Sequence, residues 1–574
     1  MKELFKNLKF AWKYSKEDKV YLIIVLTFHL INIFLSIIAP ILSAKIIIEL
    51  TNNNYIQIII VALTIFIVDI ISDIGVYIIR RCSVKIYRNT LSRLEIDLGT
   101  NILKIENKCL DENGTGVFIQ RLTNDTSRLA SVFNSILGEF SELIKYIGIL
   151  ISILIVNKLV FIYVFIMLTF IYLIENKRTR VINSKDKIVR KSKEKVSSFI
   201  SELVRGAHDI KMLNSENDFI NELSNRIYDV NDKELAMHKK KWGYKIIIFH
   251  LINTTSFLLI VLLVILMSKN IILPSIALVL YNYATRVYSS IFLIGDLLEN
   301  IQEFNLSSER IYALMNDKEF PKEKFGTIQL DKINGDFEFK NVSFGYTDKL
   351  VLNDLSFKIK ANETVAFVGK SGAGKTTIFN LLCKMYDVNY GEITIDNVNI
   401  KDLDKESIRG NITIISQNPY IFNMSIRDNL KLVKSDLVEE DMINACKTAC
   451  LDDFINELPD KYDTIVGEGG VNLSGGQKQR LAIARALVQK TEIILFDEAT
   501  SSLDNETQQK IQEAINNMKN EYTILIIAHR LSTIINADRI LYLENGKIEA
   551  EGTHKELLKK CKNYKMLYES EIQK

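Results

Sequence analysis

The stretch Val365–Thr377, which reads VAFVGKSGAGKTT, decides the fold of the C-terminal half of the chain. Four apolar residues typical of a buried strand precede a glycine-rich loop of the form G-x-x-x-x-G-K-[ST], and an apolar-periodic helix follows. Glycines let the backbone approach a phosphate closely, and the amide N–H groups and helix dipole attract the anion. In such a loop Lys375 reaches the β- and γ-phosphates, and the hydroxyl of Thr376 binds Mg²⁺. The predicted nucleotide-binding residues are Gly369, Lys370, Ser371, Gly372, Ala373, Gly374, Lys375, Thr376 and Thr377.

A pair of acidic residues supplies the second part of the predicted site. The apolar run Ile493–Phe496 is typical of a strand, and Asp497 and Glu498 follow it directly. Ligands bind at the carboxyl ends of parallel strands. We therefore expect Asp497 to hold Mg²⁺, usually through water, and Glu498 to polarise the water that attacks the γ-phosphate.

A third motif, LSGGQ at Leu473–Gln477, lies just before a predicted helix that starts near Lys478. A serine and two glycines before a helix N-terminus form another anion site. One domain does not need two γ-phosphate sites, so we expect this motif to cover a nucleotide bound to a second copy of the chain. The residues of this site are Ser474, Gly475, Gly476 and Gln477.

From about Phe337 onward, short β-branched runs alternate with helical patterns. This alternation predicts an α/β domain with a parallel sheet and crossover helices, over residues 336–574. The charged stretch 316–335 is the predicted linker to the preceding domain. The predicted strands are Val365–Val368, Ile412–Ile415, Ile493–Phe496 and Thr523–Ile527.

Residues 1–315 have a different character, because they contain long apolar runs. A helix of about 20 apolar residues spans a bilayer core of roughly 30 Å. We therefore predict an all-α transmembrane domain with six spans and two long cytoplasmic loops, at residues 80–130 and 175–241. The loops are expected to be continuations of the spanning helices, although a separate inserted domain is an alternative. The apolar runs are Val20–Ala44, Tyr55–Ile79, Ile136–Val156, Leu159–Ile174, Trp242–Met267 and Ile271–Leu298.

Charge distribution predicts the orientation of these spans. Lysines and arginines gather at the N-terminus and after the second and fourth spans, which by the positive-inside rule face the cytoplasm. We expect a multi-pass protein of the plasma (inner) membrane with its N-terminus and C-terminal domain cytoplasmic, and no cleavable signal peptide. The abundance of Ile, Lys and Asn points to a bacterium with an AT-rich genome. A net charge of +3 argues against binding to nucleic acid.

The LSGGQ motif matches the signature of ATP-binding-cassette (ABC) transporters at every position, and the whole chain resembles a half-size ABC exporter. The resemblance implies an ATPase coupled to transport that uses ATP and Mg²⁺. It also implies that Tyr346 stacks on adenine and that Gln417 senses Mg²⁺ and water. Glu468 is implied as an interdomain acid, Asp504 as the D-loop residue, and His529 as the switch histidine at the γ-phosphate.

In the membrane half, the stretches 115–129 and 200–217 resemble the two exporter loops whose coupling helices contact the ATPase. By this resemblance, a dimer holds each ATP between the glycine-rich loop of one copy and the LSGGQ motif of the other. Intact Glu498, LSGGQ and His529 favour a homodimer, while a heterodimer with a related half-transporter stays open.

The expected function is ATP-driven export of a substrate that the sequence leaves open among drug, lipid and peptide. An ATP-gated channel or membrane sensor built on the same ATPase is the alternative. Asp69 and Asp73 lie one helical turn apart within a span, and Arg286 lies in the sixth span among Tyr281, Tyr283 and Tyr288. Ionisable residues inside spans are candidates for function. They are expected either to line the translocation cavity or to form a structural ion pair.

Overall fold

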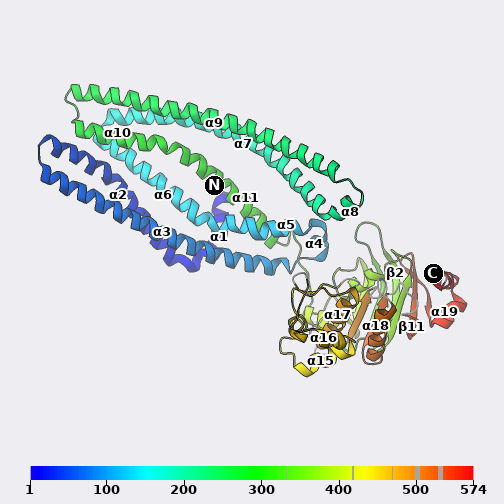
Figure 1. Cartoon of the computed structure of the whole chain (residues 1–574). Helices are drawn as coiled ribbons and strands as arrows, with labels where there is room; N and C mark the ends of the chain where they lie inside the picture. The colour runs from blue at the N-terminus through cyan, green and yellow to red at the C-terminus, as the bar shows by residue number, and fades with distance from the viewer. Residues whose placement is uncertain are drawn as a thin grey trace. The chain divides into compact units, whose positions relative to one another are not determined.

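The computed structural model describes residues 2–330, 333–416, 419–467, 470–497, 505–527 and 534–572. The chain forms two compact units. Unit 1 comprises residues 1–103 and 115–319, and unit 2 comprises residues 104–114 and 320–574. Unit 1 is built of long helices, whereas unit 2 combines sheets with shorter helices (Figure 1). Segment 104–114 therefore packs with unit 2 although both of its chain neighbours belong to unit 1.

Unit 1 contains ten described α-helices, with a 3₁₀ turn at Lys16–Asp18 and a π-helical segment at Arg121–Asp125. The α-helices are α1 (Lys2–Ser15), α2 (Lys19–Thr51), α3 (Tyr55–Ile102), α5 (Thr115–Gln120), α6 (Thr126–Val156), α7 (Lys158–Arg205), α8 (Ala207–Met212), α9 (Glu216–Ser268), α10 (Pro274–Ser289) and α11 (Ile291–Met315).

Five of the six predicted apolar runs lie wholly within helices of unit 1, and the sixth begins three residues before α10. Four helices of the described chain are long and apolar enough to cross a membrane: Glu3–Thr51, Tyr55–Ile102, Lys158–Arg205 and Glu216–Ser268. The third predicted span lies in α6, whose apolar stretch begins among charged residues. The sixth is divided at Ser290 between α10 and α11, a break that a continuous apolar run did not predict. The hydroxyl of Ser290 donates to the carbonyl of Val287 at 2.6 Å, a bond that competes with the helix ladder.

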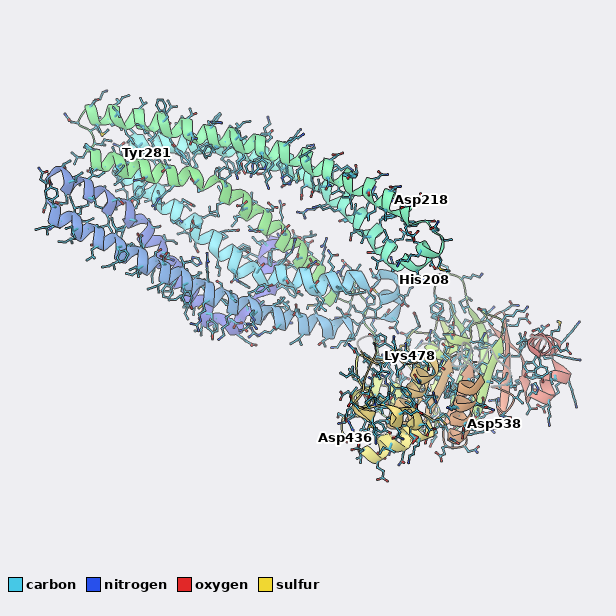
Figure 2. The ribbon with its side chains drawn as sticks, viewed as in Figure 1. His208, Asp218, Tyr281, Asp436, Lys478 and Asp538 are labelled. Carbon is cyan, nitrogen blue, oxygen red and sulfur yellow. The ribbon has the colours of Figure 1, made fainter. Side chains whose placement is uncertain are left out.

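The helices that carry the fourth and fifth apolar runs continue through residues 175–241. Helices α7 and α9 extend side by side to a short turn that contains α8 (Figure 1). Figure 2 places His208 and Asp218 at this turn and Tyr281 toward the other end of unit 1. Cross-helix contacts hold the extensions together, including the Lys193–Glu234 ion pair at 2.5 Å and stacked rings of Phe199 and Phe219. The described residues of 175–241 contain no separate inserted domain.

The ionisable residues inside the spans do not form the ion pair that was one of the two expectations. Asp69 and Asp73 are exposed on α3, and the ion pairs of the described residues include none between them and Arg286. Arg286 instead donates to the carbonyl of Ser36 in α2 at 3.2 Å. Its neighbour Tyr283 donates to the carbonyl of Ile37 at 2.6 Å, so α10 is hydrogen-bonded to α2 at this level.

Unit 2 contains three described sheets. The strands are β1 (Phe337–Phe344), β2 (Leu352–Ile359), β3 (Thr364–Gly369), β4 (Tyr390–Ile395), β5 (Val398–Asn399), β6 (Ile412–Ile415), β7 (Met424–Ser425), β8 (Ile465–Val466), β9 (Ile493–Asp497), β10 (Thr523–Ile527), β11 (Arg539–Glu544) and β12 (Lys547–Gly552).

The helices of unit 2 begin with α4 in segment 104–114. They are α4 (Asn107–Asn113), α12 (Lys375–Leu382), α13 (Lys405–Arg409), α14 (Ile426–Lys431), α15 (Glu439–Thr448), α16 (Asp452–Glu457), α17 (Gly475–Gln489), α18 (Asn505–Met518), α19 (His554–Lys560) and α20 (Lys562–Ile572), with a 3₁₀ turn at Lys461–Asp463.

The largest sheet has the strand order β12-β11-β3-β10-β9-β6 and is parallel except for the β11–β12 pair. It contains all four strands predicted from the sequence, which confirms the α/β architecture. A second sheet, β2-β1-β4-β5, is antiparallel and was not predicted. Strands β7 and β8 form a small antiparallel pair.

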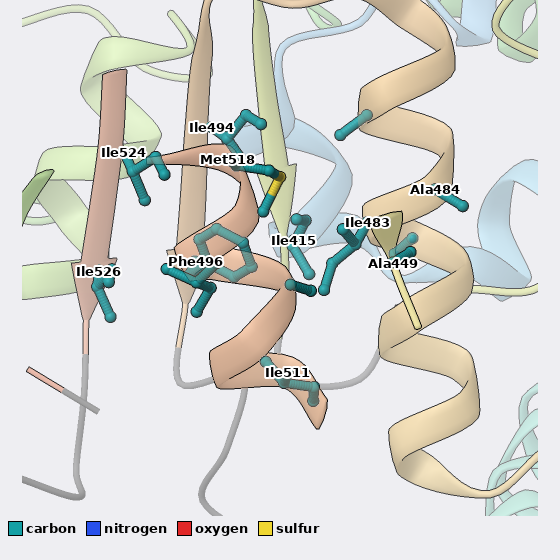
Figure 3. Packing of buried hydrophobic residues seen from close by; sticks show 14 of the residues in the cluster. Ile415, Ala449, Ile483, Ala484, Ile494, Phe496, Ile511, Met518, Ile524 and Ile526 are labelled. Atoms are coloured by element: carbon teal, nitrogen blue, oxygen red, sulfur yellow. The ribbon is translucent and has the colours of Figure 1, made fainter. Parts of the chain in front are cut away.

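Both faces of the large sheet are buried. Successive side chains of a strand point to opposite faces, so alternate residues enter two different apolar clusters. In β9, Ile494 and Phe496 pack with α17 and α18, as Figure 3 shows for Ile483 and Ile511. The alternate residues Ile493 and Leu495 belong to a second apolar cluster on the opposite face, together with the aromatic residues of the antiparallel sheet. The middle of the sheet is therefore apolar throughout, and polar chemistry is confined to its edges.

Replacing Ile494 by alanine is expected to destabilise unit 2 by about 2–5 kcal/mol, because it leaves a cavity between two packed layers. The matched control is Ile465→Ala in β8, whose side chain is 56% exposed and whose loss should cost less than about 1 kcal/mol. Thermal unfolding of the detergent-solubilised full chain measures both changes. Equal midpoints for the two variants would contradict the packing described for β9.

Candidate functional site

The candidate site lies at the carboxyl edge of the large sheet. Phe367 of β3, Ile527 of β10 and Asp497 of β9 form one row of paired residues across three adjacent parallel strands. Strand β3 ends two residues later at Gly369, where the glycine-rich loop begins, and β9 ends at Asp497. The sheet therefore brings the loop and the acidic residue to one edge, as the sequence predicted.

The glycine-rich loop has a backbone that other residues would not adopt easily. Gly372 and Gly374 have φ angles of 80° and 97°, in the left-handed region that favours glycine. At Gly369, a Cβ atom would overlap the backbone oxygen of Leu543 in β11. The loop ends at α12, whose first residue is Lys375. Loop and helix N-terminus thus form the expected cradle for an anion.

The ammonium group of Lys375 lies against this loop. Its Nζ donates to the carbonyl of Gly369 at 2.8 Å and to that of Lys370 at 3.1 Å, and the residue is only 5% exposed. These carbonyl contacts place a positive charge beside the loop. A phosphate bound at the loop would lie within reach of a charge-assisted hydrogen bond from this group.

Thr376 and Asp497 are brought together as predicted. The Thr376 hydroxyl donates to Oδ1 of Asp497 at 3.2 Å. A hydroxyl and a carboxylate oxygen at this distance are hard oxygen ligands of the kind that Mg²⁺ takes. The described residues contain no group of three or more His, Cys, Asp or Glu side chains suited to a metal. Two protein oxygens, with water and nucleotide phosphates for the rest, suit Mg²⁺, which usually keeps several waters.

Tyr346 lies next to α12. Its hydroxyl is 3.3 Å from the Thr377 hydroxyl and accepts a bond from Nδ2 of Asn380 at 3.2 Å. Its ring meets those of Phe344 and Tyr386 edge-on, each at a centroid distance of 5.0 Å. The ring borders a cavity of about 200 Å³ within unit 2, which residues 369–377 do not line. An aromatic side chain thus stands beside the glycine-rich loop, where the predicted adenine contact requires it.

The LSGGQ motif forms the start of α17. Oγ of Ser474 accepts a bond from the Gln477 amide at 3.2 Å, and the Gln477 side chain accepts one from the Ser474 amide at 2.8 Å. This capping box fixes the helix N-terminus. Ser474 and Gly475 are exposed, whereas Gly476 is buried. Figure 2 labels Lys478 in this first turn of α17. The motif therefore presents a capped helix end at the surface of unit 2.

Two arginines, of which Arg480 is buried, anchor α17 to its surroundings. Arg480 donates to the carbonyl of Cys450 at 2.7 Å. Arg485 donates to the carbonyls of Asn429 and Tyr420, at 3.1 and 2.9 Å. Burial lowers the pKa of Arg485 to about 10, so it is still a cation at neutral pH. These bonds tie α17, the helix that begins with the LSGGQ motif, to the part of the chain that follows Gln417.

Five predicted site residues lie outside the described residues: Gln417, Glu468, Glu498, Asp504 and His529. Their roles stay predictions. Three of them follow closely on strands of the large sheet, since Gln417 comes two residues after β6, Glu498 directly after β9, and His529 two residues after β10.

Sequence reasoning missed three residues near Tyr346. Tyr386 and Asn380 contact Tyr346 directly, and Asp111 contacts Tyr386. Tyr386 packs on Tyr346 and donates to Oδ2 of Asp111 at 2.8 Å. None of the three belongs to a motif with its own chemistry, and Asp111 is 275 positions away from Tyr386. Only the folded structure brings them together.

The fold and site define a P-loop nucleotide-binding protein joined to a helical membrane region. Comparison with known families agrees with this class. Residues 352–501 match the family described as ABC transporter, and residues 22–291 match the ABC transporter transmembrane region.

Individual relatives extend the similarity over most of the chain. The chain is 32% identical over 512 residues to an ATP-dependent lipid A-core flippase of Legionella pneumophila (strain Lens), covering 87% of this chain and 84% of that one. It is 42% identical over 294 residues to a protein of the same name from Haemophilus influenzae (strain 86-028NP), where it spans only about half the length (50%) of each chain. It is 29% identical over 584 residues to the uncharacterized ABC transporter ATP-binding protein YfiC of Bacillus subtilis (strain 168), covering 99% and 94% of the two chains.

The chain belongs to the ABC transporter family. One transmembrane region followed by one ATP-binding region is the arrangement of a half-size ABC exporter.

Lys375→Met is expected to reduce ATP hydrolysis by roughly 10²–10³-fold, because it removes the charge beside the phosphate cradle. The matched control is Lys547→Met, which removes an exposed lysine from β12 and should leave turnover within about twofold. Phosphate release by the purified full chain measures both. Normal turnover in Lys375→Met would exclude the glycine-rich loop as the hydrolytic site.

Proposed function

We propose that the protein is an ATP-driven exporter in which two copies bind each ATP between them. The observation that supports this proposal is that one chain forms two separate motifs at helix N-termini, the glycine-rich loop and LSGGQ. Each motif lies where the N-terminal end of a helix dipole favours an anion. A motif that is capped, exposed and anchored by Arg480 and Arg485 is suited to complete the nucleotide site of a second copy.

In the proposed cycle the residues of one chain bind and orient the nucleotide. Amides of residues 369–377 and the Lys375 ammonium hold the phosphates, and Tyr346 stacks on adenine. Mg²⁺, held by Thr376 and Asp497 and sensed by Gln417, would neutralise charge on the β- and γ-phosphates. Glu498 polarises the attacking water, while His529 donates to the γ-phosphate. Glu468 and Asp504 lie at the contact between copies.

The signature residues of the second copy supply the remaining contacts to the γ-phosphate. ATP therefore stabilises the closed dimer, because its phosphates interact with both chains at once, and hydrolysis removes that stabilisation. A homodimer suffices for this scheme, since one chain carries every predicted part of the site. Closure would move the membrane region and expose its cavity to the far side.

We further propose that the substrate is an amphipathic lipid with an acidic headgroup. Relatives of more than 30% identity over most of the chain are named lipid A-core flippases, which supports a lipid over a drug or a peptide. Arg286 is an exposed cation within a predicted span and contacts only a neutral carbonyl among its described hydrogen bonds. Such a group can pair with a phosphate. We place the protein in a bacterial inner membrane, with the ATPase unit in the cytoplasm.

Mixed dimers test whether the site is shared. Lys375→Met and Ser474→Glu should each abolish hydrolysis in homodimers, because each defect affects both sites. Co-expressed with different tags and purified through both, the mixed dimer contains one site with two intact halves. We expect it to recover up to about half of the wild-type turnover, because one complete site remains. No recovery in a verified mixed dimer would contradict the sharing of sites between copies.

Lipid translocation in vesicles tests the direction and the pump mechanism. Wild-type protein in liposomes should move an acidic fluorescent lipid only with hydrolysable ATP, and Glu498→Gln should abolish that movement by trapping ATP. An ATP-gated channel would instead give persistent ion flux down a gradient in Glu498→Gln. Detection of such a flux, without ATP-dependent lipid movement in the wild type, would overturn the exporter proposal.

A further inference from the structure

Tyr386 links the nucleotide-site aromatic to the part of unit 2 that comes from the first cytoplasmic loop. Its ring meets the Tyr346 ring at 5.0 Å with an interplanar angle of 90°. Its hydroxyl donates to Oδ2 of Asp111, in α4, at 2.8 Å. Burial and this hydrogen bond raise the pKa of Tyr386, so the phenol keeps its proton and its donor role at neutral pH. One side chain thus contacts Tyr346 through its ring and segment 104–114 through its hydroxyl.

Segment 104–114 is fixed to unit 2 by its own backbone. The Glu106 amide donates to the carbonyl of Pro321 at 2.9 Å, and the Glu323 amide donates to that of Lys104 at 2.9 Å. Ile105 lies between these bonds and is only 2% exposed. The position of Asp111 is therefore defined relative to unit 2.

The turn that carries Tyr386 is equally well supported. Arg409 donates to the carbonyls of Cys383 and Lys384, and pairs with both carboxylate oxygens of Glu323 at 2.6 and 2.9 Å. Lys384 is buried and donates to Asp387 at 2.9 Å. A ring that projects from so constrained a turn can set the angle of a neighbouring ring.

We infer that Tyr386 is a positioning residue for the nucleobase: it holds the Tyr346 ring at its stacking angle, and Asp111 holds Tyr386. This inference rests on the proposed role of Tyr346 in binding adenine. Edge-to-face contact favours one relative orientation of two rings, and a hydrogen bond to a carboxylate is stronger than one between neutral groups. Segment 104–114 is continuous with α3 and α5 of the membrane half. A shift of Asp111 would therefore change the affinity for the base.

A purely structural role for Tyr386 would need its ring but not its hydroxyl. The ring is partly buried against the apolar cluster that contains Phe344, and phenylalanine would fill the same space. The hydroxyl adds a specific link to Asp111. A test that removes only this link therefore separates positioning from packing.

The test compares Tyr386→Phe, Asp111→Ala and the double variant in the purified full chain. The KM for ATP is expected to rise roughly threefold to tenfold in each single variant, with kcat within about twofold and no further rise in the double variant. The KM for ribose 5-triphosphate, which has no base to stack, should not change. The matched control is Tyr390→Phe, an exposed tyrosine of β4, for which neither KM should change.

An unchanged KM for ATP in both single variants, or equal rises for ATP and ribose 5-triphosphate, would overturn the inference. Tyr346→Ala separates this failure from failure of the proposed site. If Tyr346→Ala leaves the KM for ATP unchanged, Tyr346 does not stack on the base and both proposals about it fail. If Tyr346→Ala raises that KM while Tyr386→Phe and Asp111→Ala do not, only the positioning role fails. Should Tyr386→Phe fold poorly, Asp111→Ala decides the matter alone, because the Tyr386 ring is then intact.

Discussion

The burial of both faces of the large parallel sheet is the constraint on which the site depends. Alternate residues of β3, β9 and β10 pack into two apolar clusters on opposite faces. Charged groups are thereby excluded from the middle of the strands and can follow only at their ends. Because the strands are parallel, their carboxyl ends meet at one edge, and the glycine-rich loop and Asp497 meet there as well. The hydrogen bond from Thr376 to Asp497 is a consequence of strand direction.

The sequence was informative wherever a feature is local. Four strands, the glycine-rich loop and the helical extensions of the spans follow from patterns only a few residues long, and the structure contains them all. The antiparallel sheet was missed because β1 pairs with both β2 and β4, and no tight hairpin motif marks the distant partner. The break at Ser290 was missed because one serine in an apolar run does not reveal which carbonyl it will contact.

The interactions around Tyr346 show the same limit within the site. A family resemblance indicated the tyrosine itself, since its motif is a short stretch of sequence. The partners that fix its ring come from the turn after α12 and, through one hydrogen bond, from α4, which is encoded far upstream. Such contacts depend on packing between distant segments, and their residue types carry no pattern of their own. Resemblance can identify a contact to the ligand, but the support of that contact must be found in the structure.

Unit 2 contains a segment, residues 104–114, that is encoded within the membrane half of the chain. Segment 104–114 is encoded between helices of the membrane region, yet its backbone bonds and buried Ile105 belong to the ATPase unit. A force on α3 or α5 would act on this segment through covalent bonds. The same segment contacts Tyr386 and, through it, the predicted base-binding ring. Residues 104–114 therefore tie the ATPase unit to α3 and α5 through the chain itself, independently of any contact between the two units.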